Sequence, residues 1–132
     1  MITLDTSGIG AIFDRRDARH TSAVQALRDD RGPYVIPAQI MAEIAWFIET
    51  RFGQRVLGEF LDDVETGQYR LDCGEDDIGR VRDLVLKYSD MPLGFADAAV
   101  IACAERHGGK VLTLDHRHFG VVARDTAITI LP

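Results

Sequence analysis

The stretch from residue 93 to residue 119, LGFADAAVIACAERHGGKVLTLDHRHF, constrains the fold more than any other part of the chain. Its first part, Gly94–His107, is apolar around almost the whole helix circumference, which is typical of a helix covered on more than one side. Gly108 and Gly109 end this helix, and the aliphatic run Val111–Leu114 then predicts a buried strand. The chain is therefore expected to fold around one helix and one strand that other elements cover.

Two acidic residues interrupt this apolar unit. Asp97 lies on the helical stripe that also carries Val100, Ile101 and Ala104, and Asp115 follows the end of the predicted strand. A carboxylate in apolar surroundings costs free energy unless it is paired or bound to a metal ion. Asp97 and Asp115 are therefore candidate functional residues.

Strands alternate with helices along the rest of the chain. The predicted strands are Met1–Leu4, Tyr34–Ile36, Tyr69–Leu71 and Ala127–Leu131, and the predicted helices are Thr6–Phe13, Asp17–Asp29, Pro37–Phe52, Gln54–Glu65 and Asp76–Tyr88. This alternation predicts a three-layer α/β/α fold with a mainly parallel sheet of four or five strands. No linker or repeat divides the chain, and 132 residues suit one core, so residues 1–132 are expected to form a single domain.

Composition and charge narrow the class of protein. Hydrophobic residues make up 46% of the chain and charged residues 27%, as in ordinary soluble domains. No apolar run approaches the roughly 20 residues of a membrane span. The first residues lack a signal-peptide pattern, so a cytoplasmic protein without membrane contact is expected. The net charge of −6 argues against a general nucleic-acid-coating protein, but it allows an enzyme that keeps acids in one cleft.

The two cysteines, Cys73 and Cys103, are too few to indicate a disulfide framework. In a cytoplasmic protein they are expected to be free thiols, because that compartment keeps thiols reduced.

The predicted topology gathers four acids at one edge of the sheet. Asp5 and Asp115 each end a strand, and the carboxyl ends of parallel strands share the edge where α/β proteins usually bind ligands. Asp97 lies in the first turn of a helix that begins above this edge. Glu43 is expected about two turns, roughly 9 Å, inside its helix and beside the apolar stripe. Four facing carboxylates would repel one another unless a divalent cation held them, and oxygen ligands favour Mg²⁺ or Mn²⁺ over zinc.

Structural roles are open alternatives for these acids. Asp5 and Asp115 could be helix N-caps, and Glu43 could be an exposed helix residue. The chain would then be a non-catalytic interaction module whose acids serve only the fold. His116 and His118 stand two residues apart in an expected loop, a spacing that does not indicate a metal site. A basic patch consists of Arg15, Arg16 and Arg19. It could be ordinary surface charge or a rim that binds RNA.

The order of these motifs resembles the PIN domain, and specifically the VapC toxins of bacterial toxin–antitoxin pairs. The resemblance rests on LDTS at the start, AEIAWF around Glu43, PLGFADAAVIACAERHG around Asp97 and VLTLDHRHF around Asp115, and it covers essentially the whole chain. It implies a metal-dependent endoribonuclease with the catalytic residues Asp5, Glu43, Asp97 and Asp115, of which Asp5 and Asp97 match the family's direct Mg²⁺ ligands. It also implies supporting hydroxyl residues at Thr6, Ser7 and Thr113.

The resemblance further implies what the protein binds and acts on. The expected substrate is structured RNA, either transfer RNA or ribosomal RNA, and its cleavage would inhibit translation. The expected cofactor is Mg²⁺, for which Mn²⁺ could substitute. A homodimer and a cognate VapB-like antitoxin that blocks the cleft are also implied. The segment Glu43–Glu65 is expected to supply much of the association surface, because it holds large apolar residues such as Trp46 and Phe60.

Overall fold

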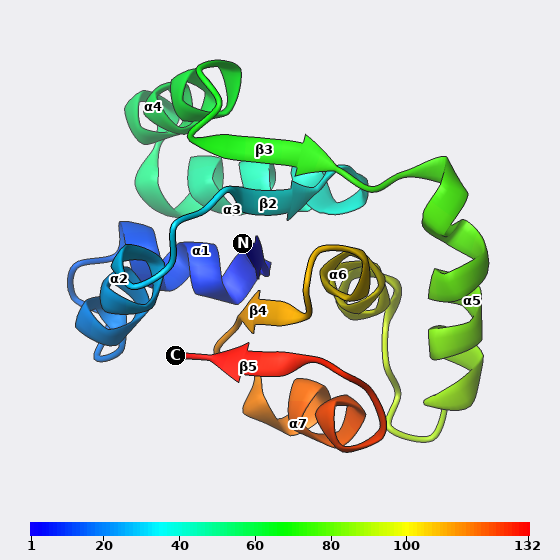
Figure 1. Ribbon diagram of the computed structural model, residues 1–132. Coiled ribbons are helices and arrows are strands. Elements are labelled where there is room, and N and C mark those ends of the chain that lie inside the picture. The colour runs from blue at the N-terminus through cyan, green and yellow to red at the C-terminus, as the bar shows by residue number, and fades with distance from the viewer.

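The computed structural model describes all of residues 1–132, and a five-stranded sheet forms its middle layer (Figure 1). The strands are β1 (Ile2–Leu4), β2 (Tyr34–Pro37), β3 (Tyr69–Asp72), β4 (Lys110–Leu112) and β5 (Thr129–Leu131). Their order in the sheet is β3-β2-β1-β4-β5, and every neighbouring pair is parallel. The predicted parallel sheet of four or five strands is therefore confirmed.

Helices cover both faces of this sheet. They are α1 (Thr6–Phe13), α2 (His20–Arg28), α3 (Met41–Phe52), α4 (Gln54–Glu65), α5 (Ile78–Lys87), α6 (Phe95–Arg106) and α7 (His116–Asp125). Because crossovers between parallel strands are right-handed, α1 to α4 lie on one face, and α5 to α7 lie on the other (Figure 1). None of these helices is long and apolar enough to span a membrane.

Helix α6 is the central element of its face. It packs against β1, β2 and β4, and it is flanked by α5 and α7 (Figure 1). Every residue from Ala98 to Ala104 is buried, as expected for a helix covered on more than one side. Gly108 and Gly109, with φ of +92° and +89°, then turn the chain into β4 in a backbone conformation that glycine adopts without strain.

Two segments differ from the sequence prediction. Pro37 ends β2 instead of starting a helix, and a 3₁₀ turn over Ala38–Ile40 precedes α3, so Glu43 lies in the first turn of α3 and not two turns inside. The segment after Asp115 was expected to be a loop but forms helix α7. This helix buries only Phe119 and Val122, which share one helical face but are too few to indicate a helix from the sequence alone.

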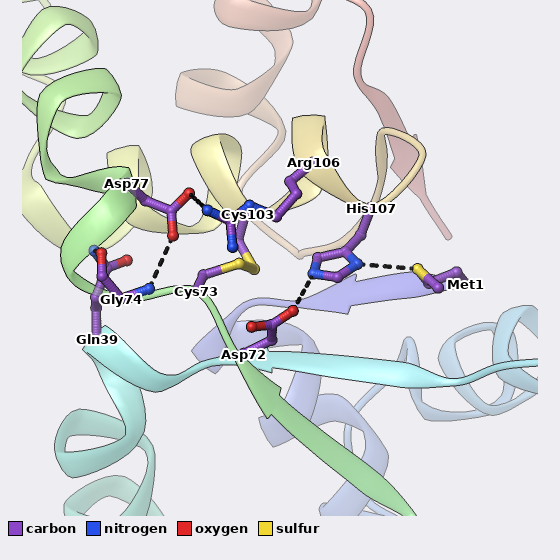
Figure 2. Close-up of a disulfide and its surroundings, with 9 residues drawn as sticks. All are labelled: Met1, Gln39, Asp72, Cys73, Gly74, Asp77, Cys103, Arg106 and His107. Carbon is purple, nitrogen blue, oxygen red and sulfur yellow. Dashed lines mark hydrogen bonds and ion pairs between the residues drawn. A yellow bond between two sulfur atoms is a disulfide. The ribbon is translucent and has the colours of Figure 1, made fainter.

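The expectation of free thiols is wrong, because Cys73 and Cys103 form a disulfide. Cys73 follows β3 and Cys103 belongs to α6, so the bond joins the end of a strand to the central helix (Figure 2). The two residues are separated by 30 positions in sequence. Only the packing of α6 against the sheet brings them together, so the number of cysteines could not show that this bond forms.

Candidate active site at the carboxyl edge of the sheet

A cleft opens where the chain leaves the middle of the sheet. The connection after β1 leads toward β2, whereas β4 lies on the other side of β1. The direction in which strands are added to the sheet therefore reverses between β1 and β4. Ligands of α/β proteins commonly bind at such a switch point. Because β1 and β4 are paired, the predicted adjacency of the strand ends near Asp5 and Asp115 is confirmed. The cleft encloses about 390 Å³ and is lined by Asp5, Thr6, Ser7, Glu43, Trp46, Phe47, Ala96, Asp97 and Asp115.

Asp5 is the most deeply buried acid of the cleft, with 6% of its surface exposed. Its Oδ2 accepts hydrogen bonds of 2.8 Å from the hydroxyls of both Ser7 and Thr113. The carboxylate makes no capping bond to α1, so the structure does not support the N-cap alternative for this residue. Burial raises the pKa of Asp5, although the bonds from Thr113 and Ser7 oppose this effect.

Hydroxyl groups join the ends of β1 and β4. Ser7 Oγ accepts a 2.9 Å hydrogen bond from the Leu114 amide, and Thr113 Oγ1 accepts one of 3.0 Å from the Asp115 amide. A third hydroxyl, Thr6 Oγ1, donates a 2.6 Å hydrogen bond to Glu43 Oε2. The three predicted supporting residues therefore each contact an acid of the cleft or the backbone that carries one.

Asp97 is half-buried in the first turn of α6. Its pKa is raised to about 6, first by burial and then by the negative charges of Asp5, Asp115 and Glu43. The buried stripe of Val100, Ile101 and Ala104 on the same helix explains why the side chain is held out of bulk water. The other three acids therefore lie close enough to oppose the ionisation of Asp97.

Asp115 serves both the fold and the cleft. Its side chain caps α7 by accepting a 3.0 Å hydrogen bond from the His118 amide, so the N-cap alternative describes part of its role. The His118 ring places Nδ1 2.8 Å from Asp115 Oδ2. Partial burial raises the pKa of Asp115, but the bonds and charge of His118, together with a hydrogen bond from the Arg117 amide, outweigh burial, and the net pKa is lowered.

His118 is a site residue that the sequence analysis did not identify. Ligand atoms of Asp97, Asp115 and His118 lie within 4.8 Å of one another. The available signal was the spacing itself, because a residue three positions after an N-cap aspartate lies one helical turn above it. His116 is exposed and outside this group.

The chemistry of the cleft suits a divalent cation. Its four acids come from separate elements, and no Lys or Arg lines the cleft to balance their charge. Burial first, and then repulsion by the other acids, raises the pKa of Asp97, and a bound cation would favour the charged carboxylate again. Carboxylate and hydroxyl oxygens are the donors that hard cations prefer.

Comparison with known proteins agrees with this fold. The family model of the PIN domain matches residues 2–125. Ribonuclease VapC26 of Mycobacterium tuberculosis is 31% identical over 121 residues, which cover 90% of this chain and 90% of that protein. The chain therefore belongs to the PIN-domain family of nucleases, as a homologue of the VapC ribonucleases. The resemblance found in the sequence is thus confirmed.

Solved structures share the fold at lower sequence identity. VapC20 of Mycobacterium tuberculosis, a sarcin–ricin loop cleaving toxin, superposes with a TM-score of 0.78 at 18% identity, covering 92% of this chain and 95% of that chain. FitAcB of Neisseria gonorrhoeae gives a TM-score of 0.72 at 16% identity, over 100% and 97% of the two chains. VapBC2 of Rickettsia felis, bound to a DNA fragment from its promoter, gives 0.69 at 13% identity over 98% and 97%.

Proposed function

We propose that this chain is a Mg²⁺-dependent endoribonuclease, the toxin of a VapBC-like pair, and that it cleaves structured transfer or ribosomal RNA to inhibit translation. The observation that carries the proposal is the set of four carboxylates that line one cleft without a balancing Lys or Arg. Membership of the PIN-domain family supports nuclease chemistry and a metal requirement. RNA as substrate is supported by the VapC26 relative, which is named a ribonuclease.

In this proposal the four acids of the cleft have different roles. Asp5 and Asp97 would hold the cation directly, while Glu43 and Asp115 complete the site. When bound, the cation would neutralise charge on the scissile phosphate and lower the pKa of a water molecule. Glu43 or Asp115 would orient that water and accept its proton.

The surrounding residues would keep the acids in position. Ser7 and Thr113 hold one oxygen of Asp5, which leaves its second oxygen for the cation. Two hydrogen bonds from His118 fix both oxygens of Asp115, so His118 acts in this proposal as a positioning residue. A side chain fixed by a second contact loses less entropy on binding than a free one.

We also propose the two partners that the resemblance implies, a cognate VapB-like antitoxin and a second copy of this chain. We further propose that residues 1–132 form one domain and that the protein is cytoplasmic. The VapBC2 assembly supports the antitoxin. Trp46 lines the cleft with 65% of its surface exposed, which suits a binding surface beside the acids. Phe60, also expected at that surface, is fully buried in the core, so that part of the expectation is wrong.

The test is cleavage of transfer and ribosomal RNA by the purified chain, with divalent cations removed by a chelator and Mg²⁺ then restored. Wild type should cut only with Mg²⁺. Asp5→Asn and Asp97→Asn should abolish cleavage with the fold intact, whereas Glu43→Gln and Asp115→Asn should retain part of it. A non-catalytic module predicts no Mg²⁺-dependent cleavage by wild type, and Asp97→Asn protein that cuts at the wild-type rate would contradict the proposed mechanism.

A further inference from the structure

A second group of metal-binding side chains lies at the disulfide, separate from the acidic cleft (Figure 2). Asp72 and Cys73 stand at the end of β3, while Cys103 and His107 belong to α6 and its C-cap. Ligand atoms of Cys73, Cys103 and His107 all lie within 4.8 Å of one another. None of these residues lines the acidic cleft.

The arrangement follows from helix geometry and burial. Cys103 and His107 are four residues apart, so they project from the same face of the helix toward the end of β3. Cys103 is fully buried, Cys73 is 4% exposed, and the His107 side chain is 10% exposed. Such a group is shielded from competing water, as is usual for structural metal sites.

His107 uses its two ring nitrogens differently. Nε2 lies 2.9 Å from Asp72 Oδ2, and Nδ1 lies 3.2 Å from the Met1 sulfur. Figure 2 shows that the nitrogen facing Asp72 is on the side of the ring nearer to the two cysteine sulfurs. Asp72 Oδ2 is the oxygen that faces this nitrogen, so the Asp72 carboxylate borders the group formed by the two cysteines and His107. Two sulfurs and one imidazole nitrogen therefore converge, and the Asp72 carboxylate lies beside the His107 ring.

We propose that this group, with its cysteines reduced, is a binding site for a thiophilic divalent cation such as Zn²⁺. The ligands are the thiolates of Cys73 and Cys103 and Nε2 of His107, and Asp72 completes a tetrahedral shell. Sulfur and imidazole donors select zinc-like cations over Mg²⁺. Bonds of roughly 2.0–2.3 Å place tetrahedral ligands roughly 3.3–3.8 Å apart. The ligand atoms of Cys73, Cys103 and His107 already lie within 4.8 Å of one another, so they need only small movements. Asp72, which contacts His107 at 2.9 Å, would move in to fill the fourth position.

The disulfide form of the site becomes the cation-bound form by reduction followed by metal binding. A dithiol reductant supplies two electrons and two protons, the bond between the cysteine sulfurs breaks, and the reductant is oxidised to its own disulfide. The cation then displaces one proton from each thiol. His107 binds through Nε2 in the tautomer that carries its proton on Nδ1, facing the Met1 sulfur, which is a weak acceptor. The disulfide and the cation are alternative links between β3 and α6.

Cobalt is the probe of choice for the test, because Co²⁺ bound to thiolates has a sulfur-to-metal charge-transfer absorption that oxygen ligands cannot produce. The full chain is reduced, supplied with excess Mg²⁺ to occupy oxygen sites, and titrated with Co²⁺. We expect one equivalent of Co²⁺ with thiolate absorption and tetrahedral visible bands, displaced by Zn²⁺. The oxidised protein should show neither band.

Matched variants separate this site from the rest of the molecule. His107→Ala leaves both cysteines in place, so it should still form the disulfide, seen as the loss of two hydrogens in the intact mass, while its Co²⁺ affinity falls at least about tenfold. His116→Ala, at an exposed histidine, should bind as wild type does. Asp97→Asn should also bind normally, because the site uses no residue of the cleft.

Thermal unfolding gives a second readout that does not depend on RNA cleavage. Zn²⁺ should raise the melting temperature of the reduced wild type, but not of the oxidised protein or of reduced His107→Ala. The proposal is overturned if reduced wild type shows no thiolate absorption with Co²⁺, or if His107→Ala binds Co²⁺ as tightly as wild type.

Discussion

At the scale of single residues, burial and nearby negative charges both raise the pKa of Asp97. Its pKa in the folded protein is about 6, against an ordinary value of 3.8. The native state therefore keeps a proton that the unfolded chain has already lost between these two values. Stability contributed by protonated Asp97 is complete below pH 3.8 and is lost as the pH rises through 6, when no cation is present.

Asp97→Asn should therefore raise the stability of the metal-free protein near neutral pH, by about 1 kcal/mol once solvent screening of a half-buried group is allowed for. The gain should vanish below pH 3.8. Mg²⁺ should stabilise wild type more than the variant, because the variant lacks one charge that holds the cation. Denaturant unfolding with chelator and with Mg²⁺ measures these differences, and Asp90→Asn, at an exposed turn, is the control. A metal-free Asn variant less stable than wild type would contradict this account.

Thr113→Val should lower the free energy of unfolding by about 1–3 kcal/mol, because it leaves buried polar groups without a partner. The Thr113 hydroxyl donates to Asp5 and accepts from the Asp115 amide, and the residue is fully buried. RNA cleavage should fall as well, since both acids lose a contact. Thr129→Val on the exposed face of β5 should change neither quantity by much. Unchanged unfolding and cleavage in Thr113→Val would show that the hydroxyl is dispensable.

At the scale of elements, the site depends on how closely α1 approaches β4. A Cβ atom at Gly8 would lie 2.3 Å from the Leu112 carbonyl oxygen, so only glycine allows this contact. The same contact sets the distance between Asp5, which precedes α1, and Thr113, which follows β4. Any residue that separates α1 from β4 would open the site as well as the core.

Gly8→Ala should cost about 1–3 kcal/mol or more through overpacking, and it should also abolish cleavage. Gly58, inside α4, has no atom within 4 Å of its would-be Cβ. Gly58→Ala should therefore stabilise the protein by about 0.4–1 kcal/mol, because alanine favours the helix. Denaturant unfolding of both variants, with cleavage assays, tests the contrast. Similar effects from the two substitutions would mean that the α1–β4 contact is not limiting.

At the scale of the whole molecule, two large apolar side chains are equally exposed but differently placed. Trp46 is 65% exposed beside the acidic cleft, and Leu86 is 66% exposed on α5. If a cognate antitoxin covers the cleft, only the first of these side chains should be buried by it.

Trp46→Ala should therefore weaken antitoxin binding about tenfold or more, as expected for an aromatic anchor at an interface. Leu86→Ala should bind the antitoxin as wild type does. Both changes should leave unfolding nearly unaltered, because exposed side chains contribute little to the core. Calorimetric titration with the antitoxin measures the effect, and equal affinities for the two variants would place the interface elsewhere.

Much of the molecule could be predicted from local pattern alone. The alternation of helices and strands, the buried helix that carries Asp97, and the acids that follow β1 and β4 all depend on residue periodicity over a few turns or one strand. The strand ends near Asp5 and Asp115 could also be placed side by side, since parallel strands end at one edge. The catalytic roles of the four acids stay a prediction until the variants are assayed.

Other features depended on contacts between distant segments. Cys73 pairs with Cys103 only because α6 packs beside the end of β3, and Phe60 is buried whereas Trp46 is exposed because α3 and α4 each turn one face to the core. His118 reaches Asp115 only once α7 has formed, and that helix has too few apolar residues for the sequence to indicate it. By itself the sequence determined most of the elements and the order of the acids, because periodicity and turn residues act locally. The tertiary structure decided which side chains meet, because packing brings together residues far apart in the chain.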